Sequence, residues 1–63
     1  MIAVTRLNGQ RFVLNAEQIR YIESTPDTMI TLMNGDKIMV REALEDVVER
    51  AVAYQRQIRV FGQ

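Results

Sequence analysis

The sequence predicts an α+β domain, in which a small antiparallel, strongly twisted sheet of about five strands precedes one C-terminal amphipathic helix. Three observations support this prediction. Short β-branched and apolar segments fill the chain before residue 41, Asn-Gly dipeptides occur twice between such segments, and the apolar period then lengthens from two residues to three or four. We therefore expect a single domain over residues 1–63, with the sheet at about 1–41 and the helix at about 42–61.

The stretch over residues 19–40 contains three apolar segments and the two turns that fold them against one another. Pro26 has no backbone N–H, so residues 25–27 are expected to form a loop rather than the centre of a strand. Asn34 and Gly35 are expected to form the second turn. The stretch is therefore predicted to fold into three consecutive antiparallel strands.

A first hairpin is predicted near the N-terminus, where two β-branched segments flank Asn8 and Gly9. This dipeptide suits the two positive-φ positions of a type I′ turn, which makes a two-residue loop. In that register Arg6 faces Arg11 across the strands, and like charges so placed are destabilising. An anionic group is therefore expected nearby. It is Glu23 or a carboxylate of a neighbouring subunit in one interpretation, and a phosphate backbone or an acidic protein partner in the other.

The same registers assign each side chain to one face of the sheet. In the first hairpin, one face carries Ala3, Thr5, Leu7, Phe12 and Leu14, and the other carries Ile2, Val4 and Val13. In the second hairpin, one face carries Met29, Thr31, Met33, Ile38 and Val40, and the other carries Ile30, Leu32 and Met39 with Thr28, Lys37 and Arg41. Both faces of the second hairpin are then substantially apolar, and one helix covers only one of them. Self-association by strand addition, helix packing or both is expected; the alternative is closure of the sheet into a small barrel.

The two predicted hairpins resemble each other in sequence. Residues 5–14 align without a gap on residues 31–40, with Thr, Asn and Gly identical. Two hairpins that use the same turn chemistry account for this similarity, and internal duplication is the alternative.

Two helical segments are predicted. Residues 15–18 are expected to form a single turn capped by Asn15, with Gln18 as the partner in a capping box. The longer C-terminal helix has acidic residues near its start and arginines near its end, as the helix dipole favours, and Gly62 is its expected stop. Its apolar seam follows steps of three and four residues, with Val48 beside it: Leu44, Val47, Ala51, Tyr54, Ile58 and Phe61.

The composition excludes several functional classes. The chain has no cysteine and no histidine, so it offers neither a thiolate nor an imidazole for metal binding or for a nucleophile–base pair. Its eight Lys and Arg balance eight Asp and Glu, whereas nucleic-acid modules are usually basic. It contains no leader-like pattern and no apolar run of about 18 residues. We expect a cytoplasmic protein without catalytic residues, cofactor, metal or membrane insertion.

Four short motifs follow one another along the chain: TRLNG at residues 5–9, IE at 22–23, TPDT at 25–28 and NG at 34–35. Each motif is common alone, but the ordered set resembles the FlbD/SwrD family of small flagellar and swarming-motility proteins. The resemblance extends from the first residue into the C-terminal helix. In that family a small hydroxylated residue, able to cap the helix, often stands where this chain has Ala43.

The resemblance implies a bacterial cytoplasmic protein, located at the flagellar base, with no established enzymatic activity. The expected partners are a second copy of the chain and proteins of the flagellar motor or stator. The matching motifs and the paired arginines supply the candidate interaction residues: Thr5, Arg6, Asn8, Gly9, Arg11, Glu23, Thr25, Pro26, Asp27 and Thr28.

Two functions follow as hypotheses. The leading one is a non-enzymatic oligomeric accessory protein that supports flagellar motor function and swarming through protein–protein contacts. The alternative is a small oligomeric nucleic-acid-binding regulator of flagellar gene expression that uses Arg6, Arg11 and Arg20.

Overall fold

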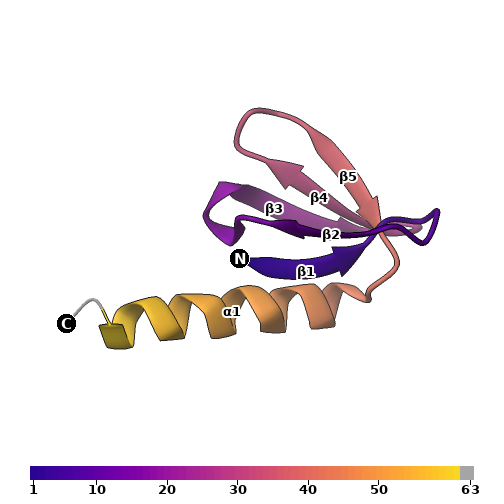
Figure 1. The fold of residues 1–63 in the computed structure, drawn as a ribbon. Coiled ribbons are helices and arrows are strands. Elements are labelled where there is room, and N and C mark those ends of the chain that lie inside the picture. The colour runs from indigo at the N-terminus through magenta and orange to yellow at the C-terminus, as the bar shows by residue number, and fades with distance from the viewer. Residues whose placement is uncertain (62–63) are drawn as a thin grey trace.

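The computed structural model describes the backbone of residues 1–61 and the side chains of residues 1–56, and it confirms the predicted α+β order. Ile58, Phe61 and Gly62 of the predicted helix lie outside the described side chains. The elements follow one another as shown in Figure 1: β1 (Ile2–Thr5), β2 (Arg11–Leu14), the 3₁₀ turn η1 (Ala16–Gln18), β3 (Ile19–Ser24), β4 (Thr28–Leu32), β5 (Lys37–Val40) and α1 (Leu44–Phe61).

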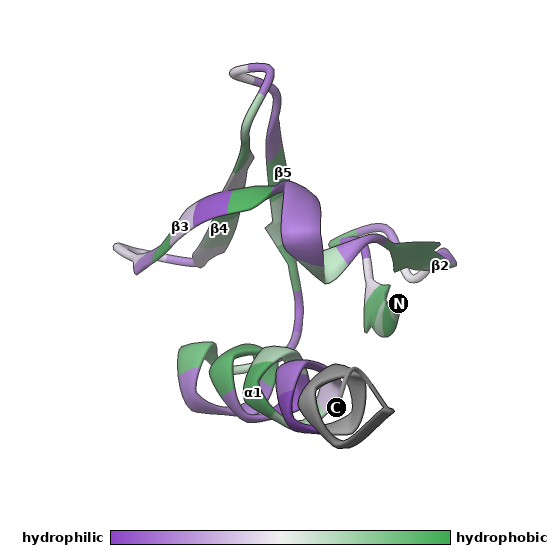
Figure 2. Ribbon diagram, turned by 90° about the vertical axis from the view of Figure 1, so that its left-hand side faces the viewer, coloured by the Kyte–Doolittle hydropathy of each residue, from purple (hydrophilic) through white to green (hydrophobic). Residues whose placement is uncertain are grey.

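The five strands form two antiparallel sheets rather than the single sheet predicted. One sheet is β1–β2, and the other has the order β3–β4–β5. An isolated bridge between Arg6 and Val40 joins the end of β1 to the end of β5. Seen along the helix, the two sheets make an arch over α1 (Figure 2). The chain therefore curls around one core, and the helix covers the open side.

Both Asn-Gly turns are three-residue loops, which corrects the predicted two-residue loops. In the first turn, the Gly9 N–H donates to the Arg6 carbonyl at 2.9 Å, and the Arg6 N–H donates to the Gln10 carbonyl at 2.8 Å. Gly9 has a φ of 93°, while Asn8 keeps a negative φ. A type I′ turn needs positive φ at both positions, so this geometry is a type I turn followed by a left-handed glycine.

This loop shifts each hairpin register by one residue and moves side chains to the opposite face. Val4 now pairs with Phe12 and Ile2 with Leu14, so these four share the core face. The prediction that split them between two faces is wrong. In the second hairpin the core face carries Thr28, Ile30, Leu32, Ile38 and Val40, and the outer face carries Met29, Thr31, Lys37 and Met39. The outer face thus combines Met29 and Met39 with Lys37, and Thr31 on the same face is buried, with 3% of its surface exposed.

The sequence similarity of the two hairpins extends to their geometry. Thr5 pairs with Arg11 and Thr31 pairs with Lys37, at the same place in each ladder. The second turn repeats the backbone hydrogen bonds of the first, with Gly35 at a φ of 95°. β2 and β5 also share one burial pattern. The same type of turn therefore occurs twice, once in each sheet.

The connection between the sheets follows the predicted single turn. The Asn15 side chain accepts the Glu17 N–H at 3.0 Å and so caps η1. Gln18 is not a capping-box partner in the described contacts. Its N–H donates to the Asn15 carbonyl, and its own carbonyl accepts the Met33 N–H at 2.7 Å. The 3₁₀ turn is thereby tied to the β4–β5 turn.

One hydrophobic core joins both sheets to the helix. Val4 of β1, Ile30 of β4, Val40 of β5 and Val47 of α1 are all at most 1% exposed. Partly buried side chains from every strand pair surround them, and Ala51 and Tyr54 extend the contact along the helix. Val47, Ala51 and Tyr54 of the predicted seam therefore face the core, whereas Val48, predicted to lie beside the seam, is 41% exposed.

The helix begins at Leu44, two residues later than predicted. The Ala43 carbonyl accepts the N–H groups of Asp46 at 3.0 Å and Val47 at 3.1 Å, which places Ala43 at the N-cap. Alanine has no side-chain oxygen for the N–H groups of the first turn, a role that serine, threonine, aspartate or asparagine usually fills.

We expect Ala43→Ser to raise the free energy of unfolding by about 1 kcal/mol, because the new hydroxyl can accept a first-turn N–H. In a domain of this size such a gain corresponds to a rise in Tm of roughly 4–8 °C. Thermal unfolding followed by circular dichroism measures it. Ala53→Ser, at an exposed position inside the helix, is the control and should lower Tm slightly. An unchanged Tm for Ala43→Ser would contradict the N-cap assignment.

Candidate functional site

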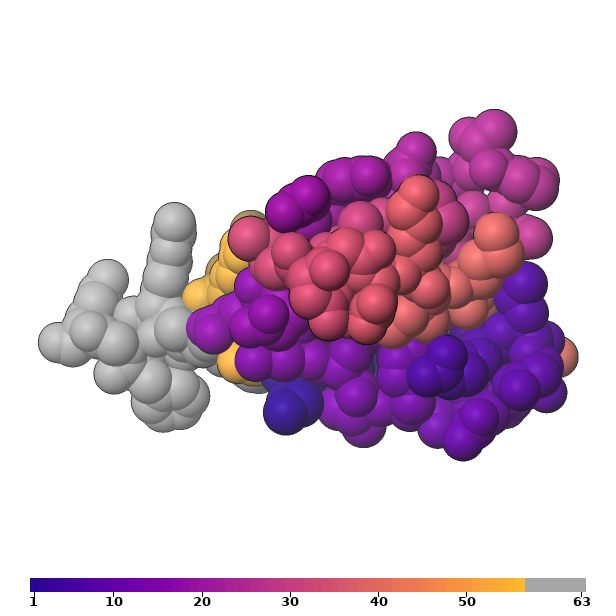
Figure 3. Space-filling model, turned by 90° about the horizontal axis from the view of Figure 1, so that it is seen from above, coloured from indigo at the N-terminus to yellow at the C-terminus, as the bar shows by residue number. Residues whose placement is uncertain are grey.

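The TRLNG segment at residues 5–9 and the TPDT segment at residues 25–28 lie at the same end of the molecule. Val40 pairs with Thr28 inside its sheet and bridges to Arg6 of the first hairpin, so it lies between the two segments. Figure 3 shows the first turn in indigo and the loop at residues 25–27 in magenta, on either side of the end of β5. We call this surface, made of residues 6–10 and 25–27, the turn end.

Most of the sequence-predicted site residues are exposed, either at the turn end or, for Arg11 and Glu23, on the strands beside it. Exposed members of the set are Arg6, Asn8, Gly9, Arg11, Glu23, Thr25, Pro26 and Asp27. Thr5 is half-buried and Thr28 is buried, with 6% of its surface exposed. Thr28 therefore belongs to the core side of β4 and supports the loop from beneath.

The predicted pairing of Arg6 with Arg11 is wrong. Arg11 lies opposite Thr5, because the three-residue loop shifts the register by one. The Arg6 guanidinium lies over the Phe12 ring, 4.5 Å from the ring centroid, which is a favourable cation–π geometry. The two arginines thus point to opposite faces of the hairpin, and no anion is required to separate them.

Arg41, directly after β5, holds the first turn in place. Its backbone N–H donates to the Thr5 carbonyl at 2.8 Å, and its Nε donates to the Leu7 carbonyl at 2.9 Å. A Cβ placed on Gly9 would lie 3.6 Å from Arg41 Nη2, so the guanidinium packs against the glycine. The TRLNG segment is therefore fixed in place by a residue that follows β5, outside the hairpin to which the segment belongs.

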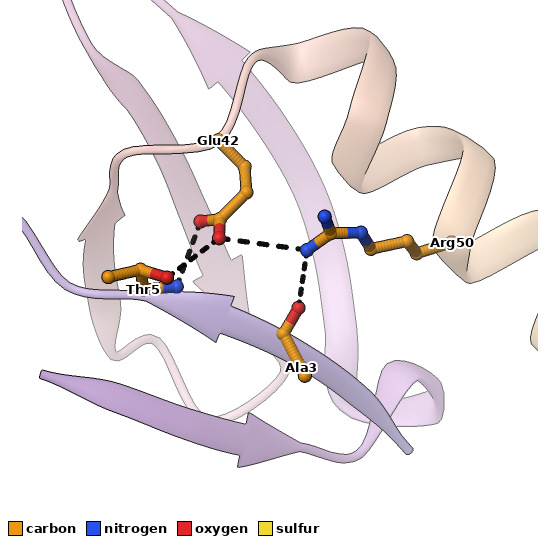
Figure 4. A network of polar contacts seen from close by, with 4 residues as sticks. All are labelled: Ala3, Thr5, Glu42 and Arg50. Carbon is orange, nitrogen blue, oxygen red and sulfur yellow. Dashed lines mark hydrogen bonds and ion pairs between the residues drawn. The ribbon is translucent and has the colours of Figure 1, made fainter.

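Glu42 makes the most extensive side-chain contacts in the described structure (Figure 4). Its Oε1 accepts the Thr5 backbone N–H at 2.8 Å, and its Oε2 accepts the Thr5 hydroxyl at 2.9 Å. Arg50 Nη1 lies 3.6 Å from Glu42 Oε2 and donates to the Ala3 carbonyl at 2.6 Å. Because Glu42 is only 14% exposed, its ion pair is better shielded from solvent than a fully exposed pair would be.

These contacts occupy the outer edge of β1. The N–H and C=O of one strand residue point to the same side, and those of Ala3 and Thr5 point away from β2. Arg41, Glu42 and Arg50 together satisfy the Thr5 N–H, the Thr5 carbonyl and the Ala3 carbonyl. These three backbone groups are therefore not available for the addition of a strand from a second copy.

The pKa of Glu42 reflects two opposing effects. Burial alone raises the pKa of its carboxyl group, because it disfavours the charged form. The hydrogen bonds from the Thr5 N–H and hydroxyl, with the positive charge of Arg50, favour the carboxylate and outweigh burial. The folded-state pKa of Glu42 therefore lies below its ordinary value of 4.5.

A shallow cleft of about 280 Å³ lies between β1 and α1. Arg11, Arg50 and Tyr54 supply its polar groups, and Met1, Ile2, Ala3 and Ala53 complete its lining. These groups can bind an anionic or hydrogen-bonding ligand; the lining contains no paired acid and base. Within the described part of the chain, no three acidic side chains converge in a way that could hold a metal ion.

Sequence reasoning missed Arg41, Glu42 and Arg50. Thr5 and Glu42 are separated by 37 positions, and Ala3 and Arg50 by 47. Charged residues at the start of a helix are usually explained by the helix dipole, so no local pattern distinguishes Glu42 from its neighbours.

A family model described as flagellar and swarming motility proteins, FlbD, matches residues 1–59 of the 63-residue chain. The chain belongs to the FlbD family. The match spans both hairpins and most of α1 of this FlbD protein, in agreement with the resemblance carried by its four motifs. No curated protein and no solved structure matches the chain.

Membership of the FlbD family connects the chain with flagellar or swarming motility. The motifs that carry the resemblance include most of the turn end. They also include Thr5, whose N–H and hydroxyl donate to the Glu42 carboxylate. Over the described residues, no helix of this FlbD protein is long and apolar enough to cross a membrane.

We expect the stability of the protein to fall in acid, partly through Glu42. Because the folded-state pKa of Glu42 is lowered, its stabilisation is complete above the unfolded pKa near 4.5 and is lost as pH falls through the folded value. Glu42→Gln should cost about 1–2 kcal/mol at pH 7, since hydrogen bonds to a charged acceptor are lost. It should also flatten the dependence of stability on pH below about 5.

Urea unfolding of wild type and Glu42→Gln between pH 3 and pH 7 measures this difference. The matched control is Glu23→Gln, which removes an exposed carboxylate on β3 that makes no hydrogen bond or ion pair within the described side chains. Equal pH profiles for wild type and Glu42→Gln would refute the assigned role of Glu42.

Proposed function

We propose that the chain is a non-enzymatic, oligomeric accessory protein that supports flagellar motor function and swarming through protein–protein contacts. We place it in the cytoplasm at the flagellar base, with motor or stator-associated proteins as its partners. The observation that carries the proposal is the turn end, where exposed residues from two separate family motifs meet beside Val40. Residues distant in sequence thereby form one surface.

Exposed apolar side chains elsewhere support a role in protein contacts. Four of the large apolar side chains that remain at least 40% exposed lie on the outer sheet face and on one side of the helix: Tyr21, Met39, Val48 and Val52. The hydrophobic core therefore leaves part of the apolar surface available to partners.

The placement of the arginines weighs against the nucleic-acid alternative. Arg6 lies at the turn end, whereas Arg20 donates to the Met33 carbonyl at 3.3 Å beside the β4–β5 turn. Figure 1 shows that this turn lies at the opposite end of the sheet. The arginines of the alternative hypothesis are thus spread over the molecule, while a phosphate backbone needs a continuous basic surface.

A tagged pull-down from cells that are building flagella, performed with and without nuclease, separates the two functions. Recovery of motor or stator-associated proteins that survives nuclease supports the proposal. Recovery of nucleic acid, with the protein partners lost after nuclease, would favour the regulator instead, and salt-sensitive binding abolished by Arg6→Glu would then be expected.

We expect the double variant Thr25→Ala, Asp27→Ala to slow swarming while leaving the fold and the oligomeric state unchanged. Truncating a residue costs more than about 1 kcal/mol of binding only where that residue is one of the few that carry most of the binding energy, so slower swarming would place this loop among them. Swarm expansion and swimming speed are measured in a strain that carries only the variant, at wild-type protein level.

The matched control is Glu17→Ala, an exposed position on η1 at the opposite end of the sheet. The control strain should swarm normally. Normal swarming by the double variant would show that the loop at residues 25–27 does not contact the partner.

A further inference from the structure

An exposed stripe runs along α1 on the side that does not face the core. It consists of Glu45, Val48, Val52 and Arg56, at steps of three, four and four residues, which bring side chains to one side of a helix. Val48 and Val52 are each 41% exposed, whereas Val47 on the core side is completely buried. The apolar middle of the stripe therefore has no cover within the described structure.

The ends of the stripe carry opposite charges. Glu45 lies three residues before Val48, and Arg56 lies four residues after Val52. Neither makes an ion pair with another described side chain. An acidic end, an apolar middle and a basic end match a second copy of the same stripe when the two helices run antiparallel. A parallel pair would instead place like charges together, which is unfavourable.

We propose that two copies of the chain associate through this α1 stripe, with antiparallel helices related by a two-fold axis. Val48 of one copy packs against the partner's Val52, and Glu45 pairs with the partner's Arg56. Each contact occurs twice, as an isologous interface requires. This proposal deepens the oligomeric part of the proposed function by assigning it a surface.

Other features of the structure agree with this choice. The outer edge of β1, an obvious place for strand addition, is occupied by the side chains of Glu42 and Arg50. A hollow lined by Glu49, Val52, Ala53 and Arg56 lies beside the stripe, where the small Ala53 side chain leaves room for a side chain of the second helix. The shape of this surface of α1 and the charges at its two ends are therefore both complementary to a second copy.

The size of the stripe sets the expected strength of association. The 18 residues of α1 span about 27 Å, and only part of that length carries the stripe. Such an interface is smaller than the roughly 800 Å² per partner of a standard complex. We therefore expect a reversible dimer whose population depends on concentration.

Sedimentation equilibrium of the purified full chain tests the proposal. Wild type should approach twice its 7.3 kDa mass as concentration rises. The double variant Val48→Ser, Val52→Ser should raise the dimer Kd roughly ten-fold or more. Val13→Ser, which changes an exposed valine on β2, should leave the Kd unchanged. Circular dichroism of each variant checks that the fold is retained.

Charge reversal provides the sharper test. Glu45→Arg or Arg56→Glu alone should raise the dimer Kd, because each creates two like-charge contacts across the axis. The double variant Glu45→Arg, Arg56→Glu restores opposite charges at both contacts and should recover most of the wild-type affinity. An equimolar mixture of the two single variants should form a heterodimer more readily than either variant self-associates.

The outcomes separate this inference from the proposed function. A monomer at all concentrations, or an oligomer that is unaffected by the valine and charge variants, would overturn the α1 interface. Recovery of motor proteins in the pull-down could persist in both cases, because the turn end is a separate surface. Loss of dimer in the single charge variants with recovery in the double variant would establish the antiparallel pairing.

Discussion

The contact between Glu42 and Thr5 determines how the helix is attached to the sheets. Glu42 lies just before α1, and its two oxygens accept the N–H and the hydroxyl of one residue near the end of β1. Arg50, about two turns further along, contacts both Glu42 and the Ala3 carbonyl. The polypeptide between β5 and the helix is thereby fixed against β1, and Val47 is directed into the core. In a chain of 63 residues with no cysteine, this polar attachment supplies positional restraint of the kind that disulfides or metals give other small domains.

The kinds and order of the elements could be predicted from the sequence because their signals are local. The proline loop, the Asn-Gly turns and the change of apolar period each act over a few residues. The register could not be predicted from the turn dipeptide alone, because Asn-Gly suits both a type I′ turn and a type I turn followed by a left-handed glycine. A second signal was present: only the observed register places Val4 and Phe12 on one face. The consistency of a buried face is therefore a better guide to register than the preference of a turn.

The candidate site was only partly predictable. The motif residues of the turn end could be found because they are consecutive in the chain, and their proximity depends on Val40, which no short motif includes. The residues that hold Thr5 and the first turn come from positions 41, 42 and 50. Contacts of such long sequence separation arise from the path of the whole chain. The same holds for the stripe on α1, since its exposure depends on which side of the helix the arch of strands covers.

The two hairpins meet along a line that has one backbone bridge, with the contacts of Arg41, Glu42 and Arg50 beside it. Within each hairpin, by contrast, neighbouring strands share a continuous ladder. Between the two sheets, the shared hydrophobic core and these side-chain contacts take the place of a ladder. The relative position of the two hairpins therefore depends on side-chain packing and side-chain hydrogen bonds more than on backbone pairing.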